Sequence, residues 1–153
     1  MSVMLAAMTQ RVNINEVPRW ATACHPYRYA KYCYDVPTVQ QEPLAKMRAD
    51  LLDVKGVGQE TADSILLYAF GFPTFAVDAY TTRLCGRYPV DAGKGYAAVK
   101  AHFEDKLPRS AKVYNTFQAL IVINAKEHCR KKPSCTGCSI AQKCEGAKLS
   151  MIN

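Results

Sequence analysis

Residues 51–84 read LLDVKGVGQETADSILLYAFGFPTFAVDAYTTRL, and this stretch holds a turn between two segments with apolar residues at helical spacing. Gly56 and Gly58 stand two residues apart in the turn, so the backbone can bend tightly there with its amides unobstructed by side chains. Such amides, together with the N-terminus of the following helix, form a natural seat for a phosphate group. Glycines that only cap and turn an ordinary helical hairpin would look the same, so the turn by itself leaves both interpretations open.

Two predicted helices flank this turn. The first begins after Pro43, a residue suited to the first turn of a helix, and stops at Gly56. Its apolar residues at helical spacing are Leu44, Met47, Leu51 and Leu52. The second helix covers residues 59–70 and ends at Gly71 and Pro73. Its predicted apolar face consists of Ala62, Ile65, Leu66 and Ala69.

Three further helices are predicted downstream, and strand signals are few. Asp78 precedes the segment AYTTRLCGRY and can cap the start of one helix. Residues 94–107 form the next helix, and residues 110–128 form the longest, which Pro133 ends. The predicted buried stripe of the longest helix consists of Val113, Tyr114, Phe117, Leu120 and Ile121. Residues 18–43, rich in Tyr, Cys, His and Pro, show neither the helical nor the strand period and receive no assignment.

Four cysteines gather near the end of the chain: Cys129, five residues, Cys135, two residues, Cys138, five residues, Cys144. A zinc ion and a [4Fe–4S] cluster both accept four thiolates, and the spacing leans away from zinc because only the middle pair forms a short knuckle. Disulfides compete, but the N-terminus resembles no secretory signal, and an intracellular chain keeps its thiols reduced. The cysteines without such grouping, expected to be ordinary thiols, are Cys24, Cys33 and Cys85.

The composition indicates a globular chain with an anionic partner. The 153 residues suffice for one ordinary domain or two small lobes, and 49% hydrophobic content is enough for a core. No apolar stretch approaches the roughly 20 residues needed to cross a bilayer. The 20 Lys and Arg against 13 Asp and Glu give a net charge of +7, which favours nucleic acid over a membrane because no long basic amphipathic face is evident.

The stretch 51–84 resembles the helix-hairpin-helix plus Gly/Pro/Asp signature of the endonuclease III superfamily of DNA glycosylases. In that family the hairpin, a Gly-Phe-Pro-like turn and an Asp occur in this order and at this spacing, and the downstream cysteines resemble its [4Fe–4S] loop. The resemblance covers residues 51–144. It implies an all-α, two-lobed fold, in which residues 1–72 form a helical lobe with the hairpin and residues 73–153 form a lobe with the catalytic Asp and the cluster loop.

The resemblance also implies roles for individual residues. Gly56, Val57 and Gly58 would hold the DNA backbone beside a lesion, with Lys55 as a phosphate contact and a monovalent cation coordinated by hairpin carbonyls. Asp78 would be the catalytic carboxylate in a cleft between the lobes, a role that can coexist with helix capping. A carboxylate there can stabilise positive charge on the sugar as the N-glycosidic bond breaks, and it can position or deprotonate water.

Glu60 departs from the bifunctional members of the superfamily, in which this position is a lysine whose amine attacks the sugar. A carboxylate cannot form a Schiff base. Residues 60–66, ETADSIL, look more like the 3-methyladenine DNA glycosylase branch, where hydrolysis is monofunctional. We therefore place Glu60 in the catalytic site, although the interaction of a first-turn glutamate with the helix dipole explains its position as well.

The N-terminal part of the chain differs most from the family. Residues 4–10, MLAAMTQ, resemble the segment whose side chain fills the gap left by an extruded base, so Gln10 is the candidate wedge and Met8 the alternative. The stretch between Gln10 and Gly56 is several helical turns shorter than in the family. Truncation, a divergent compact form and a disturbed reading frame all fit this difference.

We therefore expect an intracellular, DNA-associated monomer that binds double-stranded DNA containing a damaged base and has no membrane partner. The predicted ligands of its [4Fe–4S] cluster are Cys129, Cys135, Cys138 and Cys144. The predicted activity is hydrolytic excision of a damaged base, an alkylated purine, without strand cleavage. The alternatives are a bifunctional glycosylase and lyase, a non-catalytic DNA-binding module, and an iron–sulfur protein that carries electrons.

Overall fold

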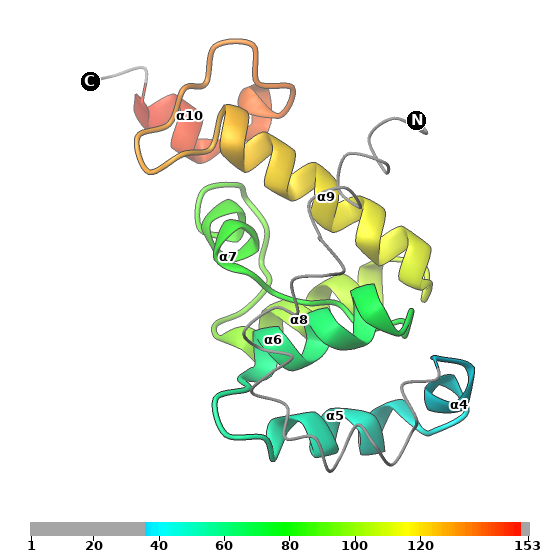
Figure 1. Cartoon of the computed structure of the whole chain (residues 1–153). Coiled ribbons are helices and arrows are strands. Elements are labelled where there is room, and N and C mark those ends of the chain that lie inside the picture. The colour runs from blue at the N-terminus through cyan, green and yellow to red at the C-terminus, as the bar shows by residue number, and fades with distance from the viewer. Residues whose placement is uncertain (1–35, 151–153) are drawn as a thin grey trace, which may run out of the picture.

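The computed structural model describes residues 36–150, and every regular element in that range is a helix. The helices are α4 (Val36–Gln40), α5 (Leu44–Leu52), α6 (Gln59–Ser64), η1 (Ile65–Ala69), α7 (Ala79–Cys85), α8 (Tyr96–Lys106), α9 (Ala111–Glu127), η2 (Ala141–Lys143) and α10 (Glu145–Ser150). Figure 1 shows α4 and α5 at one end of the molecule and α10 at the other, with the long α9 running toward α10. The predicted all-α fold is confirmed.

Helix α5 and the helix that starts with α6 form the predicted hairpin. α5 ends at Leu52, and the turn is closed by hydrogen bonds from the Val54 amide to the Leu51 carbonyl, at 3.1 Å, and from the Val57 amide to the Val54 carbonyl, at 3.0 Å. Gly56 has φ +92°, a left-handed conformation that side chains disfavour. The turn therefore begins earlier than predicted and contains Gly56 rather than starting there.

The second hairpin helix changes character halfway along. η1 continues α6 as a π-helical turn, in which the Phe70 amide donates to the Ile65 carbonyl five residues earlier, at 3.3 Å. Gly71, at φ +69°, then ends the helix as predicted. Ala69 is exposed, so the predicted apolar face is wrong at this position, because the wider π turn shifts the register of the residues after Ile65.

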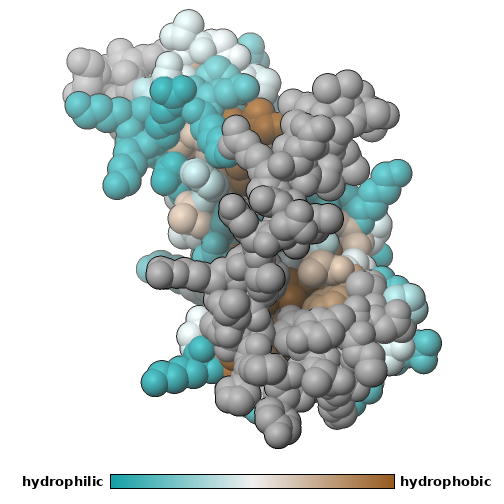
Figure 2. Space-filling view, in the orientation of Figure 1, coloured by the Kyte–Doolittle hydropathy of each residue, from teal (hydrophilic) through white to brown (hydrophobic). Residues whose placement is uncertain are grey.

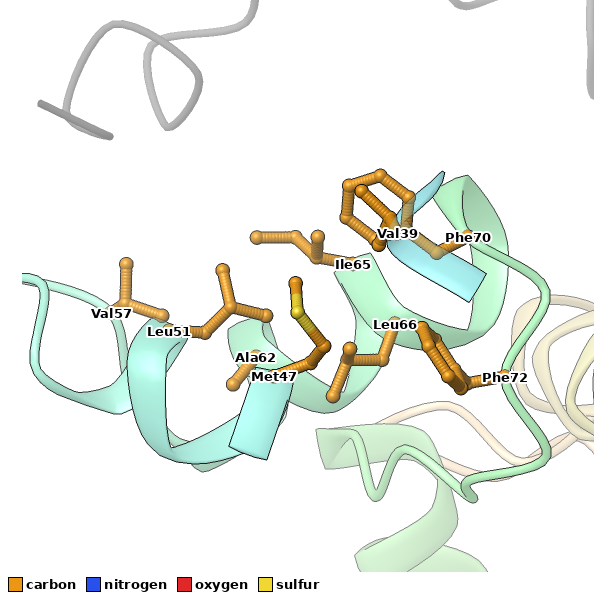
Figure 3. Close-up of a cluster of buried hydrophobic side chains, with 9 residues drawn as sticks. All are labelled: Val39, Met47, Leu51, Val57, Ala62, Ile65, Leu66, Phe70 and Phe72. Atoms are coloured by element: carbon orange, nitrogen blue, oxygen red, sulfur yellow. The ribbon is translucent and has the colours of Figure 1, made fainter. Parts of the chain in front are cut away.

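Two clusters of buried apolar side chains form the core, and the helix over residues 59–69 contributes to both. The first cluster, shown in Figure 3, consists of Val39, Met47, Leu51, Val57, Ala62, Ile65, Leu66, Phe70 and Phe72. The second consists of Leu67, Phe75, Val77, Ala92, Val99, Phe103, Tyr114 and Ile121. Adjacent residues Leu66 and Leu67 thus face different clusters. The division into lobes at residue 72 stays a prediction.

Helix α9 packs one face against α7 and η1. The residues that it buries are Tyr114, Gln118, Ile121 and Ala125. Leu120 is 58% exposed, so the predicted buried stripe is wrong at this position. Its side chain points away from the helix face that carries the four buried residues. Gln118, which polarity alone would place at the surface, is buried instead.

The surface of the C-terminal end is mainly hydrophilic on the face shown in Figure 2. This end contains α10 and the loop that precedes it (Figure 1). None of the helices within residues 36–150 combines the length and the apolar character needed to span a membrane.

Candidate catalytic pocket and cysteine loop

Asp78 lies at the N-terminus of α7, where the extended chain after Phe72 enters the helix. It is the N-cap residue, as predicted: its Oδ1 accepts hydrogen bonds from the Thr81 amide at 2.6 Å and from the Thr81 hydroxyl at 2.7 Å. Both bonds go to the same oxygen, so capping engages only one of the two carboxylate oxygens among the described residues. Helix capping and a chemical role are therefore compatible.

The structure brings Asp78 and Glu60 to the same pocket, although 18 residues separate them in sequence. The pocket has a volume of about 990 Å³ and lies between the start of α6, the start of α7, the loop before α8 and α8 itself. Partial burial raises the pKa of the Glu60 carboxyl, and the charge of Asp78 raises it further. Two carboxyl groups that line one pocket resemble the paired acids of many hydrolytic sites.

Sequence reasoning missed several residues that line this pocket. The cationic ones are Arg83, on α7, and Lys94, in the loop before α8. Tyr96, the first residue of α8, also lines it. In the sequence, these residues are marked only by lying near Asp78 or beside Gly93 and Gly95. Neither feature predicts that the loop before α8 folds back over the N-terminus of α7.

The predicted DNA-contacting turn is exposed and directly precedes α6, whose start lines the pocket. Lys55, Gly56 and Gly58 are exposed, whereas the Val57 side chain is buried in the first apolar cluster, so only the backbone of Val57 can face a ligand. Gly58 is extended and caps α6, and a Cβ atom added at Gly56 or Gly58 would meet no described atom within 4 Å. The predicted roles in DNA binding stay predictions, but the open surface suits them.

Asp63 is a fully buried charge in the second hairpin helix. Its carboxylate accepts from Arg48 Nε at 2.8 Å and Nη2 at 3.0 Å, from the Thr74 hydroxyl at 3.1 Å and from the Tyr96 hydroxyl at 2.7 Å, and Lys100 lies 3.3 Å away. Burial raises the pKa of Asp63, but the bonds from Arg48 and Tyr96 and the charge of Lys100 outweigh burial and hold the pKa below its usual range. This network joins α5, α6, α8 and the chain that leads to Asp78.

The four predicted cluster ligands line one pocket beyond the C-terminal end of α7. They are Cys129, Cys135, Cys138 and Cys144, and none of the described cysteines forms a disulfide. Arg87 donates from Nη1 to Cys129 Sγ at 3.3 Å, and the Cys138 thiol donates to Asn124 Oδ1 at 3.3 Å. Arg87 thus places a positively charged group beside one of the four sulfur atoms.

Four thiols around one pocket match the donor set of a [4Fe–4S] cluster, and the same donors also suit a zinc ion. Within residues 36–150, no three His, Cys, Asp or Glu side chains converge as ligands of a single metal ion. Zinc would need all four sulfur atoms at about 2.3 Å from one ion.

The candidate wedge residues fall outside the described range. Gln10 and Met8 lie among residues 1–35, which the structure does not describe. Cys24 and Cys33 lie there as well.

Comparison with known proteins relates this geometry to named relatives. No family model matches the chain. Over 99 residues, 64% of this chain and 45% of the relative, it is 48% identical to a "putative DNA repair glycosylase" of Methanocaldococcus jannaschii. Over 116 residues, 75% of this chain and 54% of the relative, it is 32% identical to endonuclease III of Haemophilus influenzae. The chain thus spans about half the length of these relatives.

Two solved structures share the arrangement of the helices. "Structure of a Trapped Endonuclease III-DNA Covalent Intermediate: Estranged-Adenine Complex" matches 84% of this chain and 76% of its own, with a TM-score of 0.60 and 18% identity. "Structure of a non-covalent Endonuclease III-DNA Complex" matches 88% and 79%, with a TM-score of 0.60 and 19% identity. The fold is therefore a helix-hairpin-helix fold of the endonuclease III type. In sequence and in fold, this chain is thus similar to proteins of the endonuclease III-like superfamily.

Proposed function

We propose that this chain acts as a DNA base-excision glycosylase that hydrolyses the N-glycosidic bond of a damaged base in duplex DNA. The observation that carries the proposal is the pocket that Asp78 and Glu60 share, in which partial burial and then the charge of Asp78 raise the pKa of the Glu60 carboxyl. Similarity to a "putative DNA repair glycosylase" and to endonuclease III supports the reaction class.

Asp78 is the proposed catalytic carboxylate. Its Oδ1 is fixed by the cap of α7, which holds the carboxylate at the pocket wall in one orientation. As the bond between base and sugar breaks, positive charge develops on the sugar, and a fixed carboxylate stabilises it more than mobile water can. The same group can orient the attacking water or accept its proton.

The exposed hairpin turn is the proposed site for the DNA backbone. Gly56, Val57 and Gly58 present backbone amides, and Lys55 adds a positive charge beside them. The net charge of +7 draws the chain toward an anionic polymer. Contacts of this kind place the protein on the duplex without reading its sequence, so selection of the lesion belongs to the pocket.

Glu60 supports hydrolysis without strand cleavage, because a carboxylate has no amine to form a Schiff base with the sugar. Its carboxyl lines the same pocket as Asp78, where a second acid can assist the departing base. We propose an alkylated purine as the substrate, on the resemblance of residues 60–66 to the 3-methyladenine DNA glycosylase branch.

Replacing Asp78 with Asn tests the proposal. Asp78→Asn keeps the size and much of the capping ability but removes the negative charge, so base release should fall by about two orders of magnitude or more. Duplex affinity should stay equal or rise, because a carboxylate near phosphates repels them. The assay is base release from a panel of damaged duplexes, read together with duplex binding.

Asp91→Asn is the matched control, since Asp91 is an exposed aspartate at the same pocket. It removes one negative charge without touching the cap of α7. Equal losses in both variants would show that net charge, not the Asp78 carboxylate, sets the rate. Duplex binding with no base release from any substrate by the wild-type protein would instead identify a non-catalytic DNA-binding module.

A bifunctional glycosylase and lyase is the second candidate, and Lys94 is the observation that favours it. Lys94 places an amine in the same pocket as Asp78 and Glu60, whereas Lys55 is not part of the pocket lining. One of the structural neighbours is a trapped covalent intermediate of endonuclease III with DNA. An amine at this pocket could attack the sugar if its proton were removed.

Borohydride trapping separates the two candidates. Hydrolysis through Asp78 predicts no covalent complex with DNA and an abasic product that stays unnicked until it is treated with alkali. Efficient trapping by the wild type would overturn the monofunctional proposal. Loss of that trapping in Lys94→Gln but not in Lys55→Gln would then assign the amine to the pocket lysine.

We also propose that Cys129, Cys135, Cys138 and Cys144 hold a [4Fe–4S] cluster. The shared pocket and the guanidinium of Arg87 support this assignment. Bound there, the cluster would cross-link the loop between α9 and α10 and so order the C-terminal end of the chain.

A further inference from the structure

The chain that delivers Asp78 to the pocket is extended, yet no strand pairs with it among the described residues. Side chains of α8 and α9 satisfy its backbone instead. The Phe75 amide donates to Glu104 Oε1 at 2.8 Å, and the Phe75 carbonyl accepts from Lys100 Nζ at 3.0 Å. The Ala76 carbonyl accepts from the buried amide of Gln118. The backbone of Phe75 and Ala76, just before Asp78, is therefore held by side chains of α8 and α9.

The Tyr96 hydroxyl contacts the next residue of this extended chain, Val77, and also lies close to the start of α6. The oxygen accepts from the Val77 amide at 3.4 Å and lies 3.2 Å from the Gln59 carbonyl. Val77 immediately precedes Asp78, and Gln59 immediately precedes Glu60. One side-chain oxygen thus contacts the backbone next to each of the two pocket carboxyl groups.

Asp63 fixes the orientation of that hydroxyl. The Tyr96 proton is donated to Asp63 Oδ2 at 2.7 Å, the shortest of its contacts and the one to a charged acceptor. Burial raises the pKa of the Tyr96 phenol, and the bond to Asp63 raises it further, so the proton stays on the oxygen. Asp63 itself is held by Arg48 and is fully buried, so this acceptor is fixed in place and outcompetes the Gln59 carbonyl, which lies further from the hydroxyl.

We propose that Tyr96, oriented by Asp63, is a positioning residue that sets the separation of Glu60 and Asp78 and thereby the rate of base release. This inference rests on the proposed glycosylase function. The hydroxyl donates to Asp63 of α6 and accepts from the Val77 amide, so it links the helix that carries Glu60 to the residue before Asp78.

Removing this single oxygen atom tests the inference. Tyr96→Phe keeps the ring in place, so the protein should fold. It removes the hydroxyl that links the Val77 amide to Asp63 of α6. Base release at saturating substrate should fall by about ten- to hundredfold, because small displacements of catalytic groups carry penalties of this size. The substrate concentration for half-maximal rate and the duplex affinity should change little, since the hairpin turn is untouched.

Tyr114→Phe is the matched control. Tyr114 is a buried tyrosine of α9 whose hydroxyl lies 3.5 Å from the Glu104 carbonyl, and it is not part of the pocket lining. Its loss should leave base release within about twofold of the wild type. An equal fall in both variants would overturn the inference, because any buried hydroxyl would then have the same effect. An unchanged maximal rate in Tyr96→Phe would overturn it directly.

Amide hydrogen exchange gives a readout that needs no activity. In Tyr96→Phe, but not in Tyr114→Phe, exchange should accelerate in residues 77–81 and at the start of α6. In the wild type, nuclear magnetic resonance should detect a slowly exchanging Tyr96 hydroxyl proton close to the Val77 amide. Unchanged exchange, or the absence of that proton, would overturn the positioning role. If the wild type releases no base from any substrate, the proposed function fails, while these measurements still decide whether Tyr96 joins the two walls.

Discussion

Glu60 and Asp78 bring two carboxyl groups into one pocket, and their proximity weakens the fold at neutral pH. Partial burial, and then repulsion by Asp78, raise the pKa of Glu60 in the folded protein. The folded state therefore binds this proton more tightly than the unfolded chain does. The free energy of unfolding consequently falls as the pH rises from about 4.3, the ordinary glutamate value, through the raised pKa. A site built for chemistry commonly carries such a penalty.

Glu60→Gln should remove this penalty. The variant has no carboxyl to ionise at position 60, so its melting temperature should exceed that of the wild type at pH 7. At about pH 3 the difference should vanish, because Glu60 is then protonated in the folded and unfolded states alike. Thermal unfolding across this pH range provides the measurement. In an Asp78→Asn background the gain should shrink, since one source of the raised pKa is gone, and a gain independent of both pH and Asp78 would contradict the explanation.

At the scale of residues, the sequence predicts what depends on near neighbours and misses what depends on contacts between distant segments. An aspartate directly before a helix is a common N-cap, and Asp78 is one. Tyr96 contacts Asp63 across 33 positions, and Gln118 contacts Ala76 across 42. No local pattern marks these partners. Leu120 shows the converse, because an apolar side chain at helical spacing can still lie outside the packed face.

At the scale of elements, the hairpin turn is open enough to be changed without harming the fold. Gly58 is extended rather than left-handed, and an added Cβ would meet nothing in the described part of the protein. Gly56 differs, because its φ of +92° makes any side chain strained. Position 58 is therefore where a substitution reports on DNA contact and not on folding.

Gly58→Asp should weaken non-specific duplex binding, because it places a carboxylate where the DNA backbone approaches. Gly58→Ala is the control: it adds a Cβ without charge and should weaken binding less. Both variants should melt close to the wild type. Duplex affinity measured over a range of salt concentrations should fall steeply with salt for the wild type. An affinity that is independent of salt, or equal in the two variants and the wild type, would contradict phosphate binding at this turn.

The elements themselves are largely predictable where the pattern is long and amphipathic. Helices α5, α8 and α9, and α6 taken together with η1, fall within a few residues of their predicted bounds. The short helices α4 and α10 were not predicted, since five or six residues are too few to show a period. The π turn of η1 also has no local signal, because it depends on how the two apolar clusters pack around residues 65–69.

At the scale of the whole molecule, α7 connects the pocket to the cysteine loop. Asp78 caps its first turn, and Arg83 donates to the Cys129 carbonyl at 3.1 Å. Arg87, just past the helix, donates to the Arg130 carbonyl at 2.6 Å and to the Lys131 carbonyl at 3.1 Å. Ordering of the loop therefore supports the helix that presents Asp78, the proposed catalytic carboxylate. The cysteine spacing predicts four ligands around one site. It does not predict that Arg83 and Arg87 connect the cysteine loop to the helix that begins at the Asp78 pocket.

Cys138→Ser tests whether a metal cluster, and not hydrogen bonding alone, orders this end of the molecule. Serine keeps a donor for Asn124 Oδ1, which the Cys138 thiol reaches at 3.3 Å, but it is a poor iron ligand. Wild-type protein purified without oxygen should contain iron and absorb broadly at about 400 nm. Cys138→Ser should lose most of that absorption and melt several degrees lower, because metal binding is coupled to folding. Cys85→Ser, outside the loop, should keep its iron. Stoichiometric zinc in the wild type, or a Cys138→Ser variant with unchanged iron and melting temperature, would contradict the proposed cluster.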